Sequence, residues 1–380
     1  MSQQHKILFF VNNLTLLTNW VLKLSPYLIN CEILALHNSS MHPGYKPKEL
    51  PIKNIDISCL TYQEIKQILD DFSPEICILF NFRGVIDQFF IRICKQNHIQ
   101  SIFLEHGILS KDVLTFKEIK TKNLSLRVKR VTRQFRQYLS LIIHSPEAVN
   151  EFKLFIKVLL KNKFSLNPFD KYLLYGDRCF NYLANVYNLK KGMNAYLVGY
   201  PLFDSDLQKQ NALNHLKEMN KEGVLYVHQP FILDNYTQIS YEQEKIFITK
   251  LAENLTTHYG KFTLLLHPRE SLIRYQQLYT NTNINIIQSP NDYRLFASSS
   301  LVLGHYSTAL LFSLYFDIPT FIIDYPSLLM PNIFTDVFPH VDMESLNKNT
   351  IISNMSPNKE YLLGKGNTFE NISRKILQLL

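Results

Sequence analysis

The chain is poor in glycine, and the glycine-dependent signatures of several common enzyme classes are missing from it. Eleven glycines in 380 residues leave little material for a glycine-rich phosphate cradle. The first apolar strand is not followed by a G-x-G-x-x-G fingerprint, and no G-x-x-x-x-G-K-[ST] loop or G-x-S-x-G elbow occurs. These absences disfavour an NAD-dependent enzyme, a P-loop kinase and a serine hydrolase.

Cysteine is also scarce, and its spacing suits neither disulfides nor zinc. The five cysteines are scattered singly and include no C-x-x-C pair: Cys31, Cys59, Cys77, Cys94 and Cys179. An odd number without that spacing is typical of neither a disulfide framework nor a structural metal site. We expect reduced cysteines, mostly in the core.

Long apolar runs are absent as well. The most apolar stretch, residues 300–325, is interrupted by His305, Asp317 and Pro319 before it reaches the roughly eighteen residues of a membrane-spanning helix. The N-terminal apolar run covers only residues 7–11, with no basic region and no small-residue cleavage site. We therefore expect no integral membrane segment and no signal peptide, and a cytoplasmic location.

Acidic residues are fewer than basic ones. Forty Lys and Arg face 32 Asp and Glu, which gives a formal net charge of +8. Such an excess favours an anionic partner, such as a nucleotide, an acidic polymer or a phospholipid surface. No nucleic-acid recognition motif is present, and the aromatic residues are not interleaved with the basic ones, so we expect no nucleic acid as a partner.

Short apolar segments without alternation predict buried parallel strands, and the amphipathic segments between them predict helices. In the first half the predicted strands are residues 6–11, 31–36, 76–80, 100–104, 140–144, 171–175 and 195–198. The predicted helices there are residues 14–28, 62–72, 86–97 and 147–160. After the polar stretch 202–221 a second strand series follows, at residues 223–227, 262–266, 284–287, 301–303 and 320–323. This alternation predicts two doubly wound parallel sheets.

We therefore predict an α/β chain of two Rossmann-like domains, residues 1–202 and residues 203–380. Two such domains of similar length facing a central cleft resemble the GT-B architecture. In this arrangement the first domain is the acceptor side and the second binds the nucleotide donor. The C-terminal helix, predicted at residues 371–380, is expected to pack back on the first domain.

In doubly wound sheets, ligands bind beyond the carboxyl ends of the strands. Polar residues follow five of the predicted strands: Asn12-Asn13, Glu105-His106-Gly107, His228-Gln229-Pro230, His267-Pro268 and His305 to Thr308. Four of these strand ends carry a histidine. A single histidine in such a place is more often a hydrogen-bonded structural residue, but four at successive strand ends indicate a site.

Two motifs of the second half resemble those of the bacterial GT-B sialyltransferases. His267-Pro268 follows the apolar residues 264–266 and resembles their HP motif, in which the proline fixes the backbone at the strand-to-helix turn. The segment 304–311, which contains His305, Ser307 and Thr308, resembles their serine-rich motif. Hydroxyls and free N–H groups at a helix start are suited to phosphate. The order and spacing of the two motifs make the pair more specific than either alone.

The serine-rich pattern also resembles the CDP-glycerol-dependent polyol-phosphate transferases of teichoic acid synthesis. Both groups use a cytidine nucleotide, so the resemblance implies a cytidine-type donor. In the first half, Glu105-His106-Gly107 resembles the acidic-acidic-glycine motif of the polysialyltransferases and their relatives, with His106 in place of the second carboxylate. A His-Gly pair is also what the polyol-phosphate transferases show, and this departure keeps that alternative open.

The resemblance implies an inverting glycosyltransferase that moves sialic acid or a related nonulosonic acidic sugar from a CMP donor to a bacterial surface glycan, in capsule or lipooligosaccharide. Glu105 or His106 is expected to deprotonate the acceptor, and His267 to assist the leaving phosphate. The expected donor-binding residues are His228, Gln229, Pro268, His305, Ser307 and Thr308. The expected acceptor-side residues are Asn12, Asn13, Gly107, Lys129, Arg130 and Arg133. No cofactor is expected, and a donor that leaves with a single phosphate requires no metal in principle.

The stretch from residue 111 to residue 136 is strongly basic, with nine Lys or Arg and two acidic residues. Lys129, Arg130 and Arg133 belong to it. A plain solvated helix face explains such a stretch. The functional alternatives are an electropositive groove for an anionic saccharide, or peripheral contact with the anionic lipids of the inner leaflet, where lipid-linked acceptors reside.

Two rival functions remain at the level of sequence. One is a CDP-glycerol or CDP-ribitol type polyol-phosphate transferase, which differs in its donor and leaves phosphate in the product. The other is a non-catalytic glycan-binding protein on a GT-B scaffold, which would tolerate replacement of Glu105 and His267. Arg269 and Glu270 follow the His-Pro pair, and we interpret them as a solvated helix start.

Overall fold

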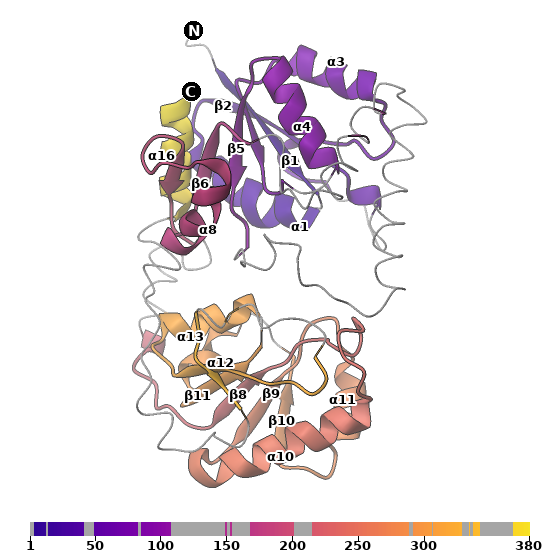
Figure 1. The fold of residues 1–380 in the computed structure, drawn as a ribbon, viewed down its shortest axis with the longest axis vertical. Coiled ribbons are helices and arrows are strands. Elements are labelled where there is room, and N and C mark those ends of the chain that lie inside the picture. Colours follow the sequence, from indigo (N-terminus) through magenta and orange to yellow (C-terminus); the bar gives the residue numbers. More distant parts are fainter. Residues whose placement is uncertain are drawn as a thin grey trace. The chain divides into compact units, whose positions relative to one another are not determined.

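The computed structural model describes residues 4–12, 14–41, 49–82, 85–107, 149, 153, 168–200, 215–288, 292–305, 307–328, 334, 337–342 and 368–380. These residues form two compact units (Figure 1). The first unit holds the described residues from 4 to 200 together with the C-terminal helix, and the second holds those from 215 to 342. The domain boundary predicted at residue 202 falls outside the described residues and stays a prediction.

The first unit is built on a parallel sheet that has seven strands within the described residues, in the order β3-β2-β1-β4-β5-β6-β7. The strands are β1 (His5–Val11), β2 (Cys31–His37), β3 (Lys53–Asp56), β4 (Ile76–Leu79), β5 (Gln100–Leu104), β6 (Lys171–Leu174) and β7 (Ala195–Leu197). β1 pairs in parallel with β2 on one side and with β4 on the other. The strand order therefore reverses between β1 and β4.

Within the described residues, the regular helices between these strands are α3 (Tyr62–Phe72), α4 (Val85–Gln96) and α8 (Asp177–Tyr187). The start of α3 is a capping box, in which the Thr61 hydroxyl accepts from the Glu64 N–H and the Glu64 carboxylate accepts from the Thr61 N–H. α3 ends at Ser73, which adopts a left-handed conformation.

The helix predicted over residues 14–28 is one continuous connection with an irregular geometry. It runs through α1 (Leu14–Leu16), a π-helical turn at Leu17–Val21, α2 (Leu22–Leu24) and a 3₁₀ turn at Ser25–Tyr27. The Thr18 hydroxyl donates to the Leu14 carbonyl at 3.0 Å, a bond that bends helices. Pro26 stands in the final 3₁₀ turn.

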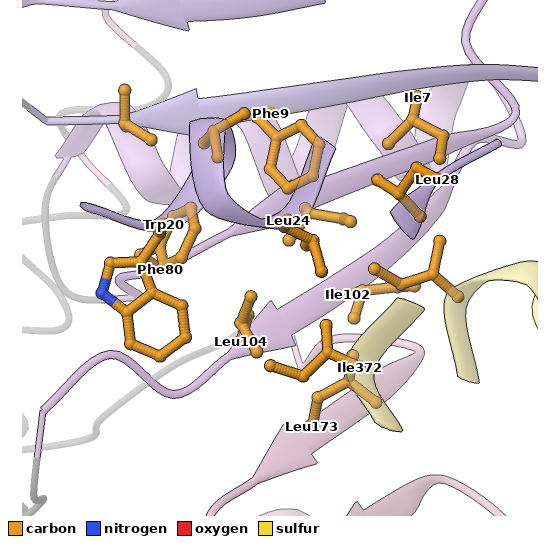
Figure 2. Packing of buried hydrophobic residues seen from close by; sticks show 14 of the residues in the cluster. Ile7, Phe9, Trp20, Leu24, Leu28, Phe80, Ile102, Leu104, Leu173 and Ile372 are labelled. Atoms are coloured by element: carbon orange, nitrogen blue, oxygen red, sulfur yellow. The ribbon is translucent and has the colours of Figure 1, made fainter. Parts of the chain in front are cut away.

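The C-terminal helix α16 (Thr368–Leu379) packs on the first unit, which confirms the predicted return of this helix (Figure 1). It buries Phe369, Ile372 and Ile376 in the same hydrophobic cluster as the side chains of β1, β4, β5 and β6. Figure 2 shows Ile372 with Ile102, Leu104 and Leu173 of that cluster. The first unit is thus completed by residues from the end of the chain.

The second unit is built on a parallel sheet that has six strands within the described residues, in the order β10-β9-β8-β11-β12-β13. The strands are β8 (Val224–Val227), β9 (Phe262–Leu265), β10 (Ile284–Ile287), β11 (Leu301–Gly304), β12 (Thr320–Ile323) and β13 (His340–Val341). The helices are α10 (Tyr241–Tyr259), α11 (Leu272–Leu278), α12 (Tyr293–Ala297) and α13 (Leu311–Tyr315). Here the strand order reverses between β8 and β11.

Two doubly wound parallel sheets confirm the predicted fold class. β3, α8 and β13 are present in addition to the predicted elements. β3 is a polar strand and β13 has two residues, and both lie at sheet edges, where burial leaves a weak pattern in the sequence. The strand predicted at 140–144 and nearly all of the helix predicted at 147–160 lie outside the described residues. Within the described part of the chain, no helix is both long and apolar enough to span a bilayer.

Candidate active site

Each sheet has one point where the strand order reverses, and ligands of doubly wound sheets bind beside the carboxyl ends of the strands at that point. In the second sheet, His228 follows β8 and His305 follows β11, the two strands at the reversal, and His267 follows the neighbouring β9. In the first sheet, Asn12 follows β1 at the reversal, and Glu105 follows β5, next to β4. The predicted residues therefore lie at the expected edge of each sheet.

His267 is held in a defined tautomer by its own turn. Its Nδ1 accepts the backbone N–H of Arg269 at 3.2 Å, so the neutral ring carries its proton on Nε2. The Gln288 amide donates to the His267 carbonyl at 3.1 Å and fixes the turn from β10. Burial lowers the pKa of the half-buried His267, and the charge of Arg269 lowers it further, against an opposing effect of Asp234. The ring can therefore offer an Nε2–H at neutral pH.

The two residues after the His-Pro pair differ from a solvated helix start. Arg269 is exposed but forms a two-pronged ion pair with Asp234, at 2.7 Å and 2.5 Å, which ties the turn after β9 to the turn after β8. Glu270 is only 6% exposed, and burial raises the pKa of its carboxyl group. Its Oε1 has no hydrogen-bond partner among the described residues.

The His228 side chain is fully buried against a carboxylate that the sequence analysis did not identify. Its Nε2 lies 3.0 Å from Oε1 of Glu244, whose other oxygen accepts from the Tyr275 hydroxyl at 2.6 Å. The Tyr325 hydroxyl also donates to Glu244. Glu244 stands in the first turn of α10, just after the capping box of Ser240. That capping signature, Ser240 followed three residues later by Gln243, marks the start of the helix after β8 and is the sequence signal that could have located Glu244.

His305 is also fully buried, with its Nε2 2.7 Å from the Tyr226 hydroxyl of β8. Burial lowers its pKa to about 3, and the neighbouring His228 lowers it further, while the Ile323 backbone opposes the shift. The rings of Phe231 and Tyr325 contact His305 edge-on, at interplanar angles of 69° and 90° and with centroids 5.1 Å and 5.2 Å away. The structure thus gives the His228 and His305 side chains supporting contacts inside the unit, and their donor-binding role stays a prediction.

The other predicted donor residues differ in exposure. Gln229 is buried, with its amide on the His228 carbonyl, and Pro268 is exposed. The Ser307 hydroxyl accepts the Ala309 N–H at 3.2 Å and so caps the short helical turn after β11. Thr308 is exposed at the start of that turn. Of the three predicted residues in the serine-rich motif, His305 is buried, Ser307 is half-buried and Thr308 is exposed to solvent.

Gly304 explains why the serine-rich motif opens with glycine. A Cβ at this position would lie 2.8 Å from the Leu310 side chain and 3.3 Å from the Val227 carbonyl. A side chain at this position would therefore displace the end of the Leu310 side chain and press on the Val227 carbonyl. This contact places the ends of the two strands at the reversal directly against each other.

In the first unit, Glu105 is buried and holds two strand ends together. Its carboxylate accepts the backbone N–H of Tyr175, which follows β6, at 2.7 Å. The same carboxylate lies beside the Cys179 thiol and raises the pKa of that buried thiol, after burial itself. This position suits a structural carboxylate, and the catalytic role of Glu105 stays a prediction.

His106 is half-buried, and its ring stands nearly perpendicular to that of Phe80, which follows β4, with centroids 6.1 Å apart. Burial lowers its pKa to about 4, against a backbone hydrogen bond with Phe80. His106 therefore leans from the end of β5 toward the strand-order reversal as a neutral imidazole. Gly107 follows it, and a Cβ there would touch nothing within 4 Å.

Asn12 is half-buried after β1. Four of the predicted acceptor-side residues lie outside the described residues: Asn13, Lys129, Arg130 and Arg133. Their roles stay predictions.

Within the described ranges, no three His, Cys, Asp or Glu side chains are grouped so as to hold a metal ion. The sequence does contain one D-x-D triplet, Asp204-Ser205-Asp206, which lies outside those ranges. Metal independence therefore stays a prediction.

Comparison with known proteins identifies the fold. No protein-family model matches the chain, and no curated protein matches it either. Among solved structures, it is similar to the UDP-GlcNAc 2-epimerase of Methanocaldococcus jannaschii in complex with UDP-GlcNAc and UDP, with a TM-score of 0.53 and 15% identity over 98% of this chain and 99% of that one. It is also similar to the glycotransferase of kitacinnamycin, with a TM-score of 0.51 and 10% identity over the whole of both chains.

A third similar structure is the wall teichoic acid polymerase TagF, in a variant soaked with CDPG. The TM-score is 0.50 and the identity 11%, over 100% of this chain and 89% of that one. At such identities the likenesses establish the fold and nothing finer. The chain has the two-domain, Rossmann-like GT-B fold, as the strand alternation predicts.

Proposed function

We propose that this protein is an inverting glycosyltransferase that transfers sialic acid or a related nonulosonic acidic sugar from a CMP-activated donor to a bacterial surface glycan. The observation that carries the proposal is the position of His267. It follows β9, beside the strand-order reversal of the second sheet, in a tautomer that leaves Nε2–H free of the turn's own hydrogen bonds. An N–H donor at this edge is what a departing phosphate requires.

In the proposed reaction, the acceptor oxygen attacks the anomeric carbon as the bond from that carbon to the phosphate oxygen breaks. The phosphate leaves with the bonding electron pair, and the Nε2–H of His267 donates a hydrogen bond to it. The lowered pKa of His267 keeps the ring neutral, so the hydrogen bond is available without a prior protonation step. Thr308, exposed at the helical turn after β11, is suited to a second hydrogen bond to the phosphate.

His106 is the better supported of the two candidate bases. The carboxylate of Glu105 is buried and already accepts the Tyr175 N–H, whereas His106 is half-buried and unprotonated at neutral pH. It would take the acceptor proton as the new glycosidic bond forms. A pKa of about 4 makes the ring a weak base, so we propose that acceptor binding changes its surroundings.

A polyol-phosphate transferase is the second candidate. The likeness to TagF, whose structure was solved with CDPG, and the His106-Gly107 pair support it. Both candidates need a nucleotide at the carboxyl edge of the second sheet. CMP leaves from both donors, but a CMP-sugar carries a single phosphate, whereas a CDP-polyol carries a diphosphate and leaves one phosphate in the product.

A thermal-shift panel with CMP, CDP, UMP, UDP and GDP tests the proposal, since a ligand that binds only the folded protein raises its melting temperature. We expect stabilisation by CMP above the other nucleotides, and loss of that stabilisation in His267→Ala. His258→Ala, at an exposed position near the end of α10, is the matched control. A preference for CDP favours the polyol-phosphate transferase. A preference for UDP or GDP would fit a GT-B enzyme but not one similar to the sialyltransferases. No response to any nucleotide favours a non-catalytic scaffold.

A further inference from the structure

Glu244 is a carboxylate with no exposure to solvent, in a unit whose other acidic side chains mostly lie at the surface. Burying a charge costs several kcal/mol unless hydrogen bonds compensate it. Glu244 is compensated by three donors: His228, Tyr275 and Tyr325. Burial raises its pKa, but these donors lower it more, so the net pKa lies below the ordinary value and the group is ionised.

The three donors come from three separate parts of the second unit. His228 follows β8, Tyr275 belongs to α11, and Tyr325 follows β12. One carboxylate at the start of α10 therefore joins elements from both sides of the strand-order reversal. The turn after β8 begins with His228, so this network holds it directly through the contact of His228 with Glu244. β8 is one of the two strands at the reversal.

A second layer of rings packs against the same turn. Phe231, three residues after His228, stands at a steep angle to His305 and to Tyr325, with centroids 5.1 Å and 4.7 Å away. The backbone N–H of Phe231 donates to the Gln229 carbonyl at 2.8 Å and closes the turn. Residues 228–231, the β8 turn, are thus held at one end by Glu244 and at the other by the ends of β11 and β12.

The charge of Glu244 also decides where His228 carries its proton. An ionised carboxylate only accepts hydrogen bonds, so the His228 Nε2, 3.0 Å away, must be the protonated nitrogen. The other ring nitrogen, Nδ1, is buried and has no hydrogen-bond partner among the described residues. Glu244 therefore fixes the proton of the ring on Nε2, while the Tyr275 hydroxyl lies 3.2 Å from the same nitrogen.

We propose that Glu244 is a positioning residue of the donor site, which holds His228 as its Nε2–H form and thereby keeps the β8 turn in the shape that binds the nucleotide-activated donor. This inference rests on the proposed function, because it assigns that donor to the carboxyl edge of the second sheet. It predicts an effect on nucleotide affinity from residues that do not touch the nucleotide. A merely structural network would change the melting temperature and leave the affinity of the folded protein unchanged.

Single-atom changes in the full chain separate the two outcomes. Glu244→Gln keeps the side chain's shape and removes its charge, and Tyr275→Phe removes one donor to Glu244. Tyr279→Phe is the matched control, because the Tyr279 hydroxyl is equally buried, on the neighbouring turn, and has no partner among the described residues. CMP affinity is measured by calorimetric titration at a temperature where each variant is folded. We expect Glu244→Gln and Tyr275→Phe to weaken CMP binding roughly tenfold or more, and Tyr279→Phe to change it less than about twofold.

Nitrogen NMR of ring-labelled histidine gives a readout that does not depend on the nucleotide. The wild-type His228 signal, assigned by its loss in His228→Asn, is expected to show a proton on Nε2, and Glu244→Gln is expected to shift or broaden it. Either of two results overturns the inference: a proton on Nδ1 of His228, or unchanged CMP affinity in both Glu244→Gln and Tyr275→Phe. In either case the proposed function still stands if the wild-type protein binds CMP. If the wild-type protein binds none of the five nucleotides, the proposed function and the inference both fall.

Discussion

At the scale of single residues, this protein places two of its histidines in buried or half-buried positions. His305 is fully buried on Tyr226, and His106 is half-buried on Phe80. Burial disfavours the charged imidazolium, and the pKa values fall to about 3 and about 4. Both rings are therefore neutral throughout the physiological range, and their hydrogen bonds do not change with small changes in pH.

The buried His305 makes stability depend on pH in a defined direction. Its folded pKa of about 3 lies below the ordinary value of 6.5, so between these values the unfolded chain binds a proton that the folded chain does not. The contribution is fully present above about pH 6.5 and is lost as the pH falls, by about 1.4 kcal/mol per pH unit. In His305→Asn we expect urea unfolding, followed by circular dichroism at pH 7.5, 6 and 5, to show a loss of stability between pH 6 and pH 5 that is smaller than in the wild type by about this amount.

The control for this experiment is His258→Asn, at an exposed position of α10, which is expected to keep the wild-type slope. His305→Asn is also expected to be less stable at pH 7.5 by about 1–3 kcal/mol, because it leaves the Tyr226 hydroxyl without its partner. An unchanged slope in His305→Asn would show that folding does not lower the pKa of His305.

At the scale of elements, α16 follows the second unit in the sequence but belongs to the first unit in the fold. It ends the chain but packs in the core of the first unit (Figures 1 and 2). Phe369 meets Trp20 edge-on at 6.0 Å, Trp20 meets Phe80 at 5.7 Å, and Phe80 meets His106 at 6.1 Å. A continuous row of aromatic contacts therefore links α16 to the candidate base.

Replacing Phe369 with alanine is expected to destabilise the first unit by about 3–5 kcal/mol, because a buried aromatic ring is lost and a cavity is left. Trp20 is the only tryptophan of the chain and lies against Phe369, so its fluorescence reports unfolding of this unit. Leu377→Ala, at a position of the same helix that is 39% exposed, serves as the control and should cost well under 1 kcal/mol. Equal stability of both variants would mean that α16 does not contribute to the core.

At the scale of the whole molecule, the net charge of +8 is unevenly distributed along the sequence. Nine of the 40 basic residues stand between residues 111 and 136. This stretch lies outside the described residues, so its role rests on the sequence alone. A positive net charge raises the local concentration of anionic partners, and added salt weakens this attraction.

Changing Lys129, Arg130 and Arg133 together to glutamate is expected to weaken binding to vesicles that contain anionic lipids, or to anionic saccharide acceptors. The loss should be several-fold at low salt and small at high salt, because exposed charges are screened over about 10 Å at 0.1 M. Flotation with vesicles at two salt concentrations measures it, with Lys245, Lys250 and Lys261 of the second unit changed in a control of equal charge. If both triple variants bind alike, the effect belongs to the net charge and not to this stretch.

The strands could be predicted from sequence because a parallel strand buried on both faces must be apolar throughout. β1, β4, β8 and β9 are such strands, and their predicted and observed ranges agree closely. The polar edge strand β3 has no such constraint and was not predicted. Ligands of doubly wound sheets bind at the carboxyl ends of the strands, and strand direction alone therefore predicts that His106, His267 and Thr308 lie at those ends, as they do.

The partners of these residues were decided by tertiary structure. Glu244 and His228 are sixteen residues apart, and Tyr275 and Tyr325 are farther still, so no local pattern relates them. From the sequence, Glu270 is interpreted as an exposed first-turn carboxylate, but in the fold it is 6% exposed and accepts a hydrogen bond from the Tyr241 hydroxyl of α10 at 3.5 Å. The sequence by itself determined the alternation of strands and helices, and with it the GT-B fold and the edge at which the candidate site residues lie, because burial and chain direction act on neighbouring residues. Only the tertiary structure decided which charges are buried, which tautomers they impose and which helix completes the first core, because those depend on contacts between residues far apart in the chain.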